Sequence, residues 1–488
     1  MGVSLTKSFD FTGDPLRLLG LFADEPYPFL LDSSQFDSRR GRYSFVGFDP
    51  FEVFKGRGRD ALALLKQRFL NYREEGSIAP TPLPSGIVGY LGYDYGLSQE
   101  KIRLRAKEDL GLPDCCFGFY DCILTVDHLR RKLHITSCGF PEKGQSLRQK
   151  RAEERLRYVL KKLSSLEKTP PLSSRTCPKI HRGEKGGVHR YPFAGTPAAP
   201  FHLFSNFSRD EYLGAVRKAL CCIEAGDIYQ VNLSQRFDLN FPSSPFDSLQ
   251  AYKILRELSP SSFGGYWKGD DFCLLSSSPE RFLHLENGIV QTRPMKGTRP
   301  RGGNSAEDQR LREEIERSPK DRAELLMITD LERNDLGRVC AYGSVRVKEM
   351  RTVEEYQYVF QATSSIEGTL RKEKDCFDLI QACFPGGSVT GCPKIRAMEI
   401  IEELEPVRRG PYTGSMGYIS FSGDMDLNIL IRTLLCTGSG IHFQVGGGIV
   451  ADSTPEGEYE ETLVKARAMQ ACLEQMRNYA QTDHLARR

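Results

Sequence analysis

The feature that most constrains the fold is a series of short runs in which aromatic and β-branched residues alternate with other residues. Gly, Pro or Asp bounds each run, as is typical of strands that end in turns. The runs are YPFLLDS (27–33), GRYSFVGFDPFEVF (41–54), GIVGYLGYDYG (86–96), CCFGFYDCILTVD (115–127) and KLHITSC (132–138). They predict antiparallel β-sheet in this part of the chain.

Helical patterns follow these runs. A charged segment at 142–167 has helical character, and SRDEYLGAVRKALCCIEAG (208–226) places apolar residues at helical spacing. Ser208 stands three residues before Glu211, which is the capping-box pattern of a helix start. We predict a helix in each segment.

Further strands follow the second helix. The stretch IYQVNLSQRFDLNF (228–241) predicts a strand, and DFCLLSSSPERFLHLENGIVQTRPMKGT (271–298) predicts strands that turn back at Asn287-Gly288. Because helices and paired antiparallel strands recur along the chain, the expected fold class is α+β.

The length of 488 residues exceeds what one ordinary hydrophobic core holds. Residues 168–204 are rich in Pro, Gly and basic residues and lack an apolar period, which is typical of a linker or a long surface loop. We therefore expect an amino-terminal region at 1–167, a linker at 168–204 and a carboxyl-terminal domain at 205–475.

Composition excludes several classes of protein. Lys+Arg number 67 against 64 Asp+Glu, so the chain lacks the concentrated basic field of a nucleic-acid binder. No window reaches the roughly 18 apolar residues of a membrane span, and the first residues lack the apolar core of a secretory signal. The 14 cysteines show no C-x-x-C pair, and reduced thiols are expected in the cytoplasm. We expect a soluble cytoplasmic protein.

Two acidic helix patterns are candidates for a metal site. In GGGIVADSTPEGEYEETLVKARAM (446–469), Glu458, Glu461 and Lys465 share one face of a predicted helix. In SPKDRAELLMITDLERNDLGRV (318–339), Asp321 and Glu324 are spaced i, i+3. Taken alone, the first pattern is usually a solvated helix face, and charges that suit the helix dipole explain the second pattern as well as a site does. The functional interpretation is a Mg²⁺ site, since Mg²⁺ takes one or two protein carboxylates and completes its shell with substrate oxygen and water.

Glycine-rich stretches and one arginine indicate an anionic ligand. PGGSVTGCPKIRAMEIIEELEP (385–406) places glycines before a predicted helix, where free backbone N–H groups bind anions, but it lacks the Gly-Lys-Ser/Thr of a nucleotide loop. Gly446–Gly448 form a second such stretch, and Arg432 lies in a predicted apolar strand at 427–437. A buried arginine is rarely left unpaired. The implied ligand is a small molecule with more than one carboxylate, bound partly through Mg²⁺.

Several motifs occur in the order found in chorismate-utilizing enzymes, and the resemblance spans roughly 205–470. They are SSSPERF, RPMKGTRPRG, DLERNDLGRV, FPGGSVTGCPK, RRGPYTGSMGY and GGGIVADSTPEGEYEET. GRYSFVGFDP and GIVGYLGYDYG resemble the amino-terminal region shared by anthranilate synthase and aminodeoxychorismate synthase component I. The resemblance implies two antiparallel sheets packed in a sandwich with helices on the outside.

The resemblance also implies roles for single residues. Glu280 would be the general acid that helps the C4 hydroxyl of chorismate leave. Glu324 and Glu461 would hold Mg²⁺, with Asp321 and Glu458 nearby. The substrate-binding residues would be Gln230, Thr298, Ser388, Tyr412, Arg432, Gly447, Gly448 and Lys465.

Lys296 distinguishes the branches of the family. Anthranilate synthases carry alanine in the corresponding P-I-A-G-T, whereas aminodeoxychorismate synthases carry lysine in P-I-K-G-T, and this chain reads PMKGT. The resemblance implies that Lys296 attacks C2 in a covalent intermediate and that ammonia then attacks C4. Neighbouring arginines and partial burial are expected to lower its pKa. Isochorismate synthases carry a lysine base where this chain has Gln230, which disfavours hydration of chorismate.

Partners and alternatives follow from the same resemblance. No glutaminase signature is present, so ammonia is expected from a separate glutamine amidotransferase subunit, component II, and the product would be aminodeoxychorismate for 4-aminobenzoate and folate biosynthesis. Anthranilate synthase component I is the nearest alternative. A catalytically idle tryptophan-binding protein is another, although the acidic and basic site residues argue against it. Possible tryptophan-binding residues are Leu31, Asp32, Ser33, Tyr43 and Ser44.

Overall fold

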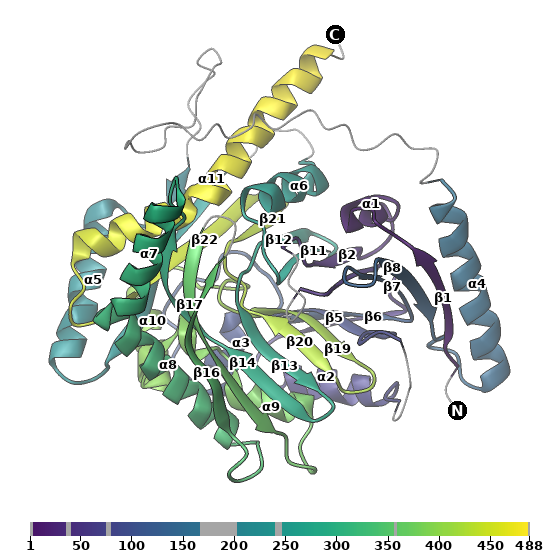
Figure 1. Ribbon diagram of the computed structural model, residues 1–488, viewed down its shortest axis with the longest axis horizontal. Helices are drawn as coiled ribbons and strands as arrows, with labels where there is room; N and C mark the ends of the chain where they lie inside the picture. The colour runs from purple at the N-terminus through teal and green to yellow at the C-terminus, as the bar shows by residue number, and fades with distance from the viewer. Residues whose placement is uncertain are drawn as a thin grey trace.

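The fold consists of two antiparallel β-sheets with helices around them (Figure 1). The structure is a computed structural model that describes residues 3–35, 41–74, 80–165, 203–239, 246–355 and 359–486, with side chains to residue 479 in the last helix. The expected α+β class and the two-sheet architecture are confirmed. Apart from residues 203 and 204, the predicted linker lies outside the described residues.

The first sheet has twelve strands within the described residues, in the order β1-β8-β7-β3-β2-β11-β12-β21-β22-β10-β18, and β9 also pairs with β10. The strands are β1 (Leu5–Asp10), β2 (Phe29–Asp32), β3 (Tyr43–Gly47), β7 (Cys122–Asp127), β8 (Lys132–Ser137), β9 (Phe204–Ser205), β10 (Gln230–Leu239), β11 (Gly264–Lys268), β12 (Phe272–Ser276), β18 (Gly391–Cys392), β21 (Thr433–Thr437) and β22 (Gly440–Ile449).

The second sheet has ten strands within the described residues, in the order β15-β17-β14-β13-β20-β19-β5-β6-β4, and β16 also pairs with β17. The strands are β4 (Glu52–Gly56), β5 (Gly86–Leu91), β6 (Cys115–Tyr120), β13 (Arg281–Glu286), β14 (Ile289–Arg293), β15 (Met295–Pro300), β16 (Arg346–Glu355), β17 (Val359–Thr369), β19 (Ser415–Ser420) and β20 (Met425–Asn428).

Helices cover the outer faces of both sheets (Figure 1). The first sheet packs against α1 (Pro15–Gly20), α4 (Gln145–Leu163), α6 (Ser248–Leu258) and α11 (Pro455–Ala486). The second packs against α2 (Ala61–Leu70), α8 (Pro319–Gly337) and α9 (Cys376–Cys383). The other helices among the described residues are α3 (Tyr93–Gln99), α5 (Arg209–Glu224), α7 (Ser305–Arg317) and α10 (Lys394–Leu404), and residues Gly387–Val389 form a 3-10 turn.

An aromatic core fills the space between the two sheets. The ring of Phe45 on the first sheet lies 5.3 Å from that of Tyr418 on the second, and the ring of Tyr90 on the second lies 5.7 Å from that of Phe272 on the first. Trp267 is fully buried in the same cluster. Edge-to-face aromatic contacts of this kind add to the burial of large apolar surfaces, and they fix the two sheets face to face.

Strands from both sides of the predicted linker share each sheet. Leu31 on β2 pairs with Gly265 on β11 in the first sheet, and Val88 on β5 pairs with Tyr418 on β19 in the second. The two parts of the chain therefore have a continuous core, while the predicted boundaries remain a prediction.

Most predicted local elements are present. Ser208 and Glu211 form the capping box of α5, and the turn at Asn287-Gly288 has φ of 51° and 78°, as a tight hairpin turn requires. The predicted strand at 86–96 is wrong in its second half, because α3 begins at Tyr93.

The predicted single strand at 427–437 is also wrong. It divides into β20 in the second sheet and β21 in the first, and Arg432 lies in the connection with a φ of 50°. A left-handed backbone cannot continue a strand, so the chain changes sheets at this point. Arg432 is thereby placed at the junction of the two sheets, where its carbonyl oxygen accepts a hydrogen bond from Ser277 N at 3.1 Å.

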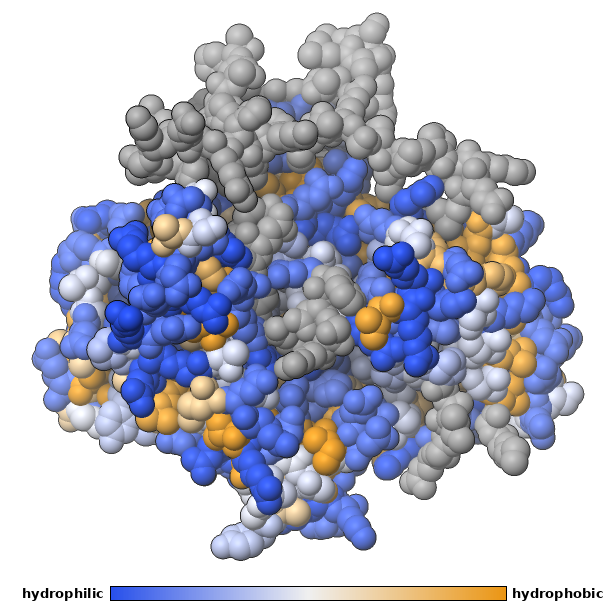
Figure 2. Space-filling view, viewed as in Figure 1, coloured by the Kyte–Doolittle hydropathy of each residue, from blue (hydrophilic) through white to orange (hydrophobic). Residues whose placement is uncertain are grey.

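Two further features concern the surface and the cysteines. On the face shown in Figure 2, hydrophilic side chains predominate and hydrophobic ones form small separate groups. No helix among the described residues is long and apolar enough to span a membrane. Every cysteine in the described part of the chain is a free thiol.

Candidate active site

Lys296 lies at an irregularity of strand β15. The register between β15 and β17 shifts between Lys296 and Thr298, and Gly297 between them has a φ of +80°. Glycine adopts this left-handed conformation without the steric cost of a side chain. The Lys296 ammonium donates a hydrogen bond to the Ser388 carbonyl oxygen at 3.2 Å, which joins β15 to the turn at Gly387–Val389.

Burial lowers the pKa of Lys296. Desolvation is the largest cause, and the nearby Lys465 ammonium acts in the same direction, while Glu324, Glu280 and Glu461 oppose it. A lowered pKa increases the fraction of neutral amine, which is the nucleophilic form.

The expected contribution of the arginines to this pKa is wrong. Arg299 pairs with Glu314 and Asp321, Arg301 pairs with Asp308, and Arg293 pairs with glutamates of β16. These acidic partners therefore compensate the arginine charges, which do little to lower the pKa of Lys296.

Gly448 lies directly against the Gln230 amide and near the Lys296 amine, at a place where a side chain would not fit. A Cβ atom at this position would lie 2.8 Å from Gln230 Nε2 and 3.5 Å from Lys296 Nζ. Gln230 is fully buried, and neither its Nε2 nor its Oε1 has a hydrogen-bond partner among the described residues. Buried polar atoms are normally paired, so these atoms are suited to hydrogen bond a bound polar ligand.

Glu280 is a buried carboxyl group near the amine. It precedes β13, its residue is 4% exposed, and its backbone carbonyl accepts a hydrogen bond from Ile429 N at 3.0 Å. Burial raises the pKa of Glu280 to about 7, although the Ser388 hydroxyl and the Lys296 charge oppose the rise. A carboxyl group with this pKa holds a proton near neutral pH and can deliver it as a general acid.

The four predicted acidic residues come from two helices. Asp321 and Glu324 lie on α8, and Glu458 and Glu461 lie on α11. Burial raises the pKa of Glu324, and the charges of Asp321 and Glu461 add to the rise. A Cβ atom at Gly447 would lie 2.7 Å from Glu458 Oε2 and 3.5 Å from Glu461 Oε1. The structure therefore brings the two helices together at one site.

The donor set suits Mg²⁺. Glu458 Oε2 is buried and has no hydrogen-bond partner among the described residues, and all the donors are carboxylate oxygens. No three acidic, histidine or cysteine side chains in the described ranges converge to enclose an ion by themselves. Because Mg²⁺ needs only one or two protein carboxylates and takes the rest of its shell from substrate and water, the residues fit this ion.

Other predicted substrate-binding residues surround the same place. The Lys465 ammonium donates to the Gly446 carbonyl oxygen at 2.8 Å and pairs with Glu461 at 2.7 Å. Desolvation would raise the pKa of Glu461, but Lys465 and Lys296 outweigh it, so this pKa is lowered. Tyr412 packs with its ring 5.7 Å from the Arg409 guanidinium.

Thr298 is not joined to the other predicted site residues by any described contact. It is exposed, and its hydroxyl accepts a hydrogen bond from Gln361 at 3.4 Å. Its predicted role in substrate binding therefore gains no support from the described contacts.

Sequence reasoning missed a buried ion pair behind the site. Arg409 donates to both carboxylate oxygens of Glu405 at 2.9 and 2.7 Å and to the carbonyl oxygens of Val389 and Asn232. Asn232 in turn donates to the Ser388 carbonyl oxygen at 2.9 Å. Arg409 occurs in the RRGPYTGSMGY motif, but no local pattern indicates its partner or its burial.

The residues predicted to bind tryptophan lie together on β2, β3 and their flanks. Asp32 accepts hydrogen bonds from Arg256 at 2.7 Å and Tyr252 at 3.0 Å, and Ser33 N donates to the Ser44 hydroxyl at 3.1 Å. Leu31 and Tyr43 are partly buried in the same region. The residues are thus neighbours, and their tryptophan-binding role remains a prediction.

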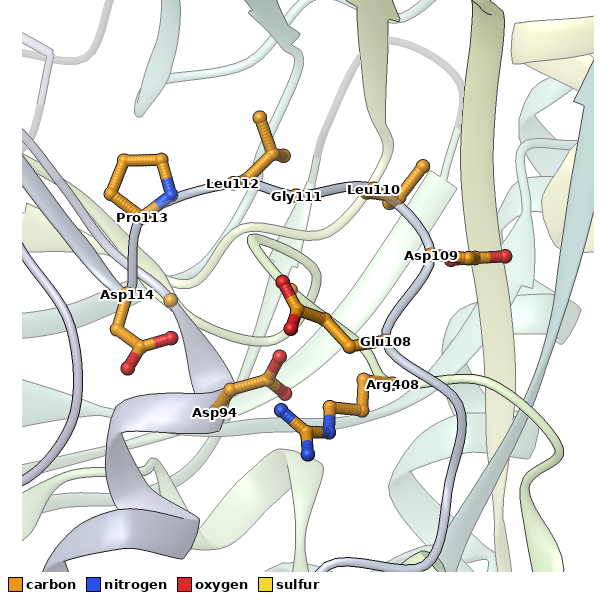
Figure 3. A pocket seen from close by; sticks show the side chains of 11 residues that line it. Asp94, Glu108, Asp109, Leu110, Gly111, Leu112, Pro113, Asp114 and Arg408 are labelled. Carbon is orange, nitrogen blue, oxygen red and sulfur yellow. The ribbon is translucent and has the colours of Figure 1, made fainter.

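A separate pocket has none of the predicted site residues in its wall (Figure 3). Asp94 and Arg408 face each other across it, with Glu108 beside them, and Leu112 and Pro113 form part of the rim. Burial raises the pKa of Asp94 to about 7.

Known proteins resemble the chain over nearly its whole length. It is 40% identical to anthranilate synthase component 1 of Thermus thermophilus over 93% of this chain and 94% of that protein. It is 37% identical to aminodeoxychorismate synthase component 1 of Bacillus subtilis over 90% of each. The structure is similar to that of anthranilate synthase component I from Streptococcus pneumoniae, with a TM-score of 0.72, 30% identity, and coverage of 89% and 93% of the two chains.

A match between the chain and a family profile assigns the chain to a family. The profile of the chorismate binding enzyme family aligns with residues 29–471, which include Lys296, Glu280 and the carboxylates of α8 and α11. The chain therefore belongs to the chorismate binding enzyme family.

Proposed function

We propose that this chorismate-utilizing enzyme is an aminodeoxychorismate synthase component I, which converts chorismate and ammonia to 4-amino-4-deoxychorismate. The observation that carries the proposal is Lys296, a lysine with a lowered pKa that lies beside a buried acid and an unpaired glutamine amide. Its position within the family motif adds support, because anthranilate synthases carry alanine there.

In the first step, the neutral Lys296 amine forms a bond to C2 of chorismate. The ring π electrons shift, the bond from C4 to its hydroxyl oxygen breaks, and Glu280 donates its proton so that water leaves. The lysine nitrogen keeps both of its protons and becomes a positively charged secondary ammonium, which can later leave as a neutral amine. Covalent catalysis of this kind divides one difficult displacement into two easier steps.

In the second step, ammonia forms a bond to C4, the π electrons shift back, and the bond from C2 to the lysine nitrogen breaks. The Glu280 carboxylate accepts the proton that ammonia loses, so the acid and the amine return to their starting states. Glu324 and Glu461 would hold Mg²⁺, which supplies positive charge for the carboxylate groups of the substrate. Gln230, Gly448 and Lys465 would orient the substrate against the amine.

Anthranilate synthase component I is the second candidate, and the relatives support it as well, since proteins of both names are similar to this chain. In that reaction ammonia attacks C2 directly and no enzyme nucleophile is needed. Lysine in place of alanine at 296 favours the first candidate. The names "component 1" of the relatives support a separate glutaminase partner as the source of ammonia.

The test combines product identification with intact mass spectrometry. Purified protein with chorismate, Mg²⁺ and ammonium salt is expected to form aminodeoxychorismate, whereas release of pyruvate with anthranilate would support the second candidate. Without ammonia, the wild type should gain the mass of chorismate less one water, because the first step stops at the lysine adduct.

Lys296→Ala should lose the adduct and reduce amination by at least about a hundredfold, since covalent catalysis is removed. Lys348→Ala is the matched control, because this lysine is 56% exposed and pairs with Glu367 at the surface. Full amination activity in Lys296→Ala would refute the nucleophile.

A further inference from the structure

A buried carboxyl group lies near Glu280 and has no role in the proposed reaction. Glu332 on α8 is 7% exposed, and Thr292 on β14 is 3% exposed. Thr292 Oγ1 lies 2.9 Å from Glu332 Oε2 and 2.7 Å from the carbonyl oxygen of Phe282. Thr292 thus connects α8 to the strand that begins directly after Glu280.

The contacts of Thr292 determine where the protons lie. A threonine hydroxyl has one proton to donate, whereas a carbonyl oxygen only accepts. Phe282 lies where β13 changes register with both neighbouring strands, and the contact of its carbonyl oxygen with Thr292 Oγ1, at 2.7 Å, is shorter than the 2.9 Å contact with Glu332, so we place the hydroxyl proton on the carbonyl side. The contact between Thr292 and Glu332 then requires the carboxyl group to be the donor. Glu332 must therefore carry a proton.

The charges around Glu332 agree with this assignment. Burial raises its pKa well above the usual range, and the charge of Glu280 adds to the rise. Asp335 on the same helix pairs with Lys394 of α10 at 2.5 Å, so these two charges compensate each other. Burial also raises the pKa of the Cys383 thiol of α9, which stays neutral.

We propose that Glu332 is a permanently protonated positioning residue, which donates to Thr292 and so holds the start of β13 and the direction of the Glu280 side chain. The proposal rests on the proposed function only for the role of Glu280 as the acid. The connection from Glu332 to Glu280 is short. Glu332 contacts Thr292, Thr292 donates to the Phe282 carbonyl oxygen, and Phe282 lies two residues after Glu280. The methylene stem of Glu332 also lies against the Gly387–Val389 turn, since a Cβ atom at Gly387 would be 3.8 Å from Glu332 Cγ.

The test compares three variants in which the donor is kept, removed or left without its acceptor. Glu332→Gln keeps an N–H donor for Thr292, so kcat should stay within about threefold of wild type. Glu332→Leu removes the donor, and Thr292→Val removes the hydroxyl. Each should reduce kcat roughly tenfold to a hundredfold with little change in KM, as expected for a misdirected catalytic group. The double variant should lose no more than either single variant, because both break one connection.

The pH profile distinguishes a protonated from an ionised Glu332. If Glu332 is protonated, Glu332→Gln removes no charge and the limb of kcat/KM that reports Glu280 stays at the same pH. A shift of that limb to lower pH would overturn the proposal, because it would mean that a negative charge had been removed beside Glu280. Wild-type kcat in Thr292→Val would overturn it as well.

Infrared spectroscopy tests the proton without any turnover. The difference spectrum of wild type minus Glu332→Gln at neutral pH should show the C=O band of a protonated carboxylic acid, which shifts in D₂O. A carboxylate band in its place would refute the assignment. This readout remains valid if the product proves to be anthranilate, so failure of the proposed function and failure of this inference are distinguishable.

Discussion

Removal of the Glu405 charge should strongly destabilise the protein. The Glu405 and Arg409 side chains are 3% and 1% exposed and form two hydrogen bonds at 2.7 and 2.9 Å. Glu405 also accepts hydrogen bonds from the backbone and the hydroxyl of Ser234, each at 2.8 Å. Glu405→Gln preserves the shape but leaves the Arg409 charge buried without compensation. Loss of one partner of a buried pair costs about 3–5 kcal/mol.

The assay is urea unfolding at neutral pH, followed by the fluorescence of the single tryptophan, Trp267, which is fully buried, and by circular dichroism. A decrease in the midpoint with an unchanged slope gives the loss in the free energy of unfolding. Glu316→Gln is the matched control, because its pair with Arg312 is exposed and spaced i, i+4. Such a pair contributes about 0.3–0.5 kcal/mol.

A loss in Glu405→Gln that matches the loss in the surface control would refute the reasoning. It would mean that water reaches the Arg409 guanidinium, or that its hydrogen bonds to carbonyl oxygens are enough to stabilise the buried charge without Glu405. Because Arg409 also donates to Val389 and Asn232, we expect the variant to have a raised KM for chorismate as well.

Two further predictions concern Gly448 and Asp94. Gly448→Ala should raise the KM for chorismate at least about tenfold, because its Cβ atom would lie 2.8 Å from Gln230 Nε2 and displace this amide; Gly438→Ala, with no atom within 4 Å, is the control, and an unchanged KM in Gly448→Ala would contradict the binding role given to Gly448 and Gln230. Burial raises the pKa of Asp94 to about 7, well above that of an aspartate in the unfolded chain, so the folded protein binds the extra proton and stability falls as pH rises from about 4 to 7. Asp94→Asn should therefore raise stability by about 1–3 kcal/mol at pH 8 and by much less at pH 5 in thermal unfolding, and an equal gain at both pH values would contradict the shift.

Local patterns in the sequence predicted the elements that depend on neighbouring residues. The capping box of Ser208 and Glu211, the turn at Asn287-Gly288 and the shared helix face of Glu458 and Glu461 each span only a few residues. Short-range sterics and hydrogen bonds decide such features, so they are readable without knowledge of the rest of the fold.

The family motifs added the candidate site, because they name residues that are far apart in the chain. They implied Lys296, Glu280 and the carboxylates of α8 and α11, and the structure places these side chains within electrostatic reach of one another. The motifs did not indicate Glu405 or Glu332, since neither residue lies in a pattern that predicts its partner.

Only the tertiary structure decided the charges around Lys296. In the sequence its nearest cations are Arg293, Arg299 and Arg301, yet strand and helix packing pairs each of them with an acidic residue. The strand pairing of β15 with β17 and the turn at Gly387–Val389 bury the amine instead, and this burial lowers its pKa. A charge acts through its distance and the solvent around it, and both are set by segments that are remote in the sequence.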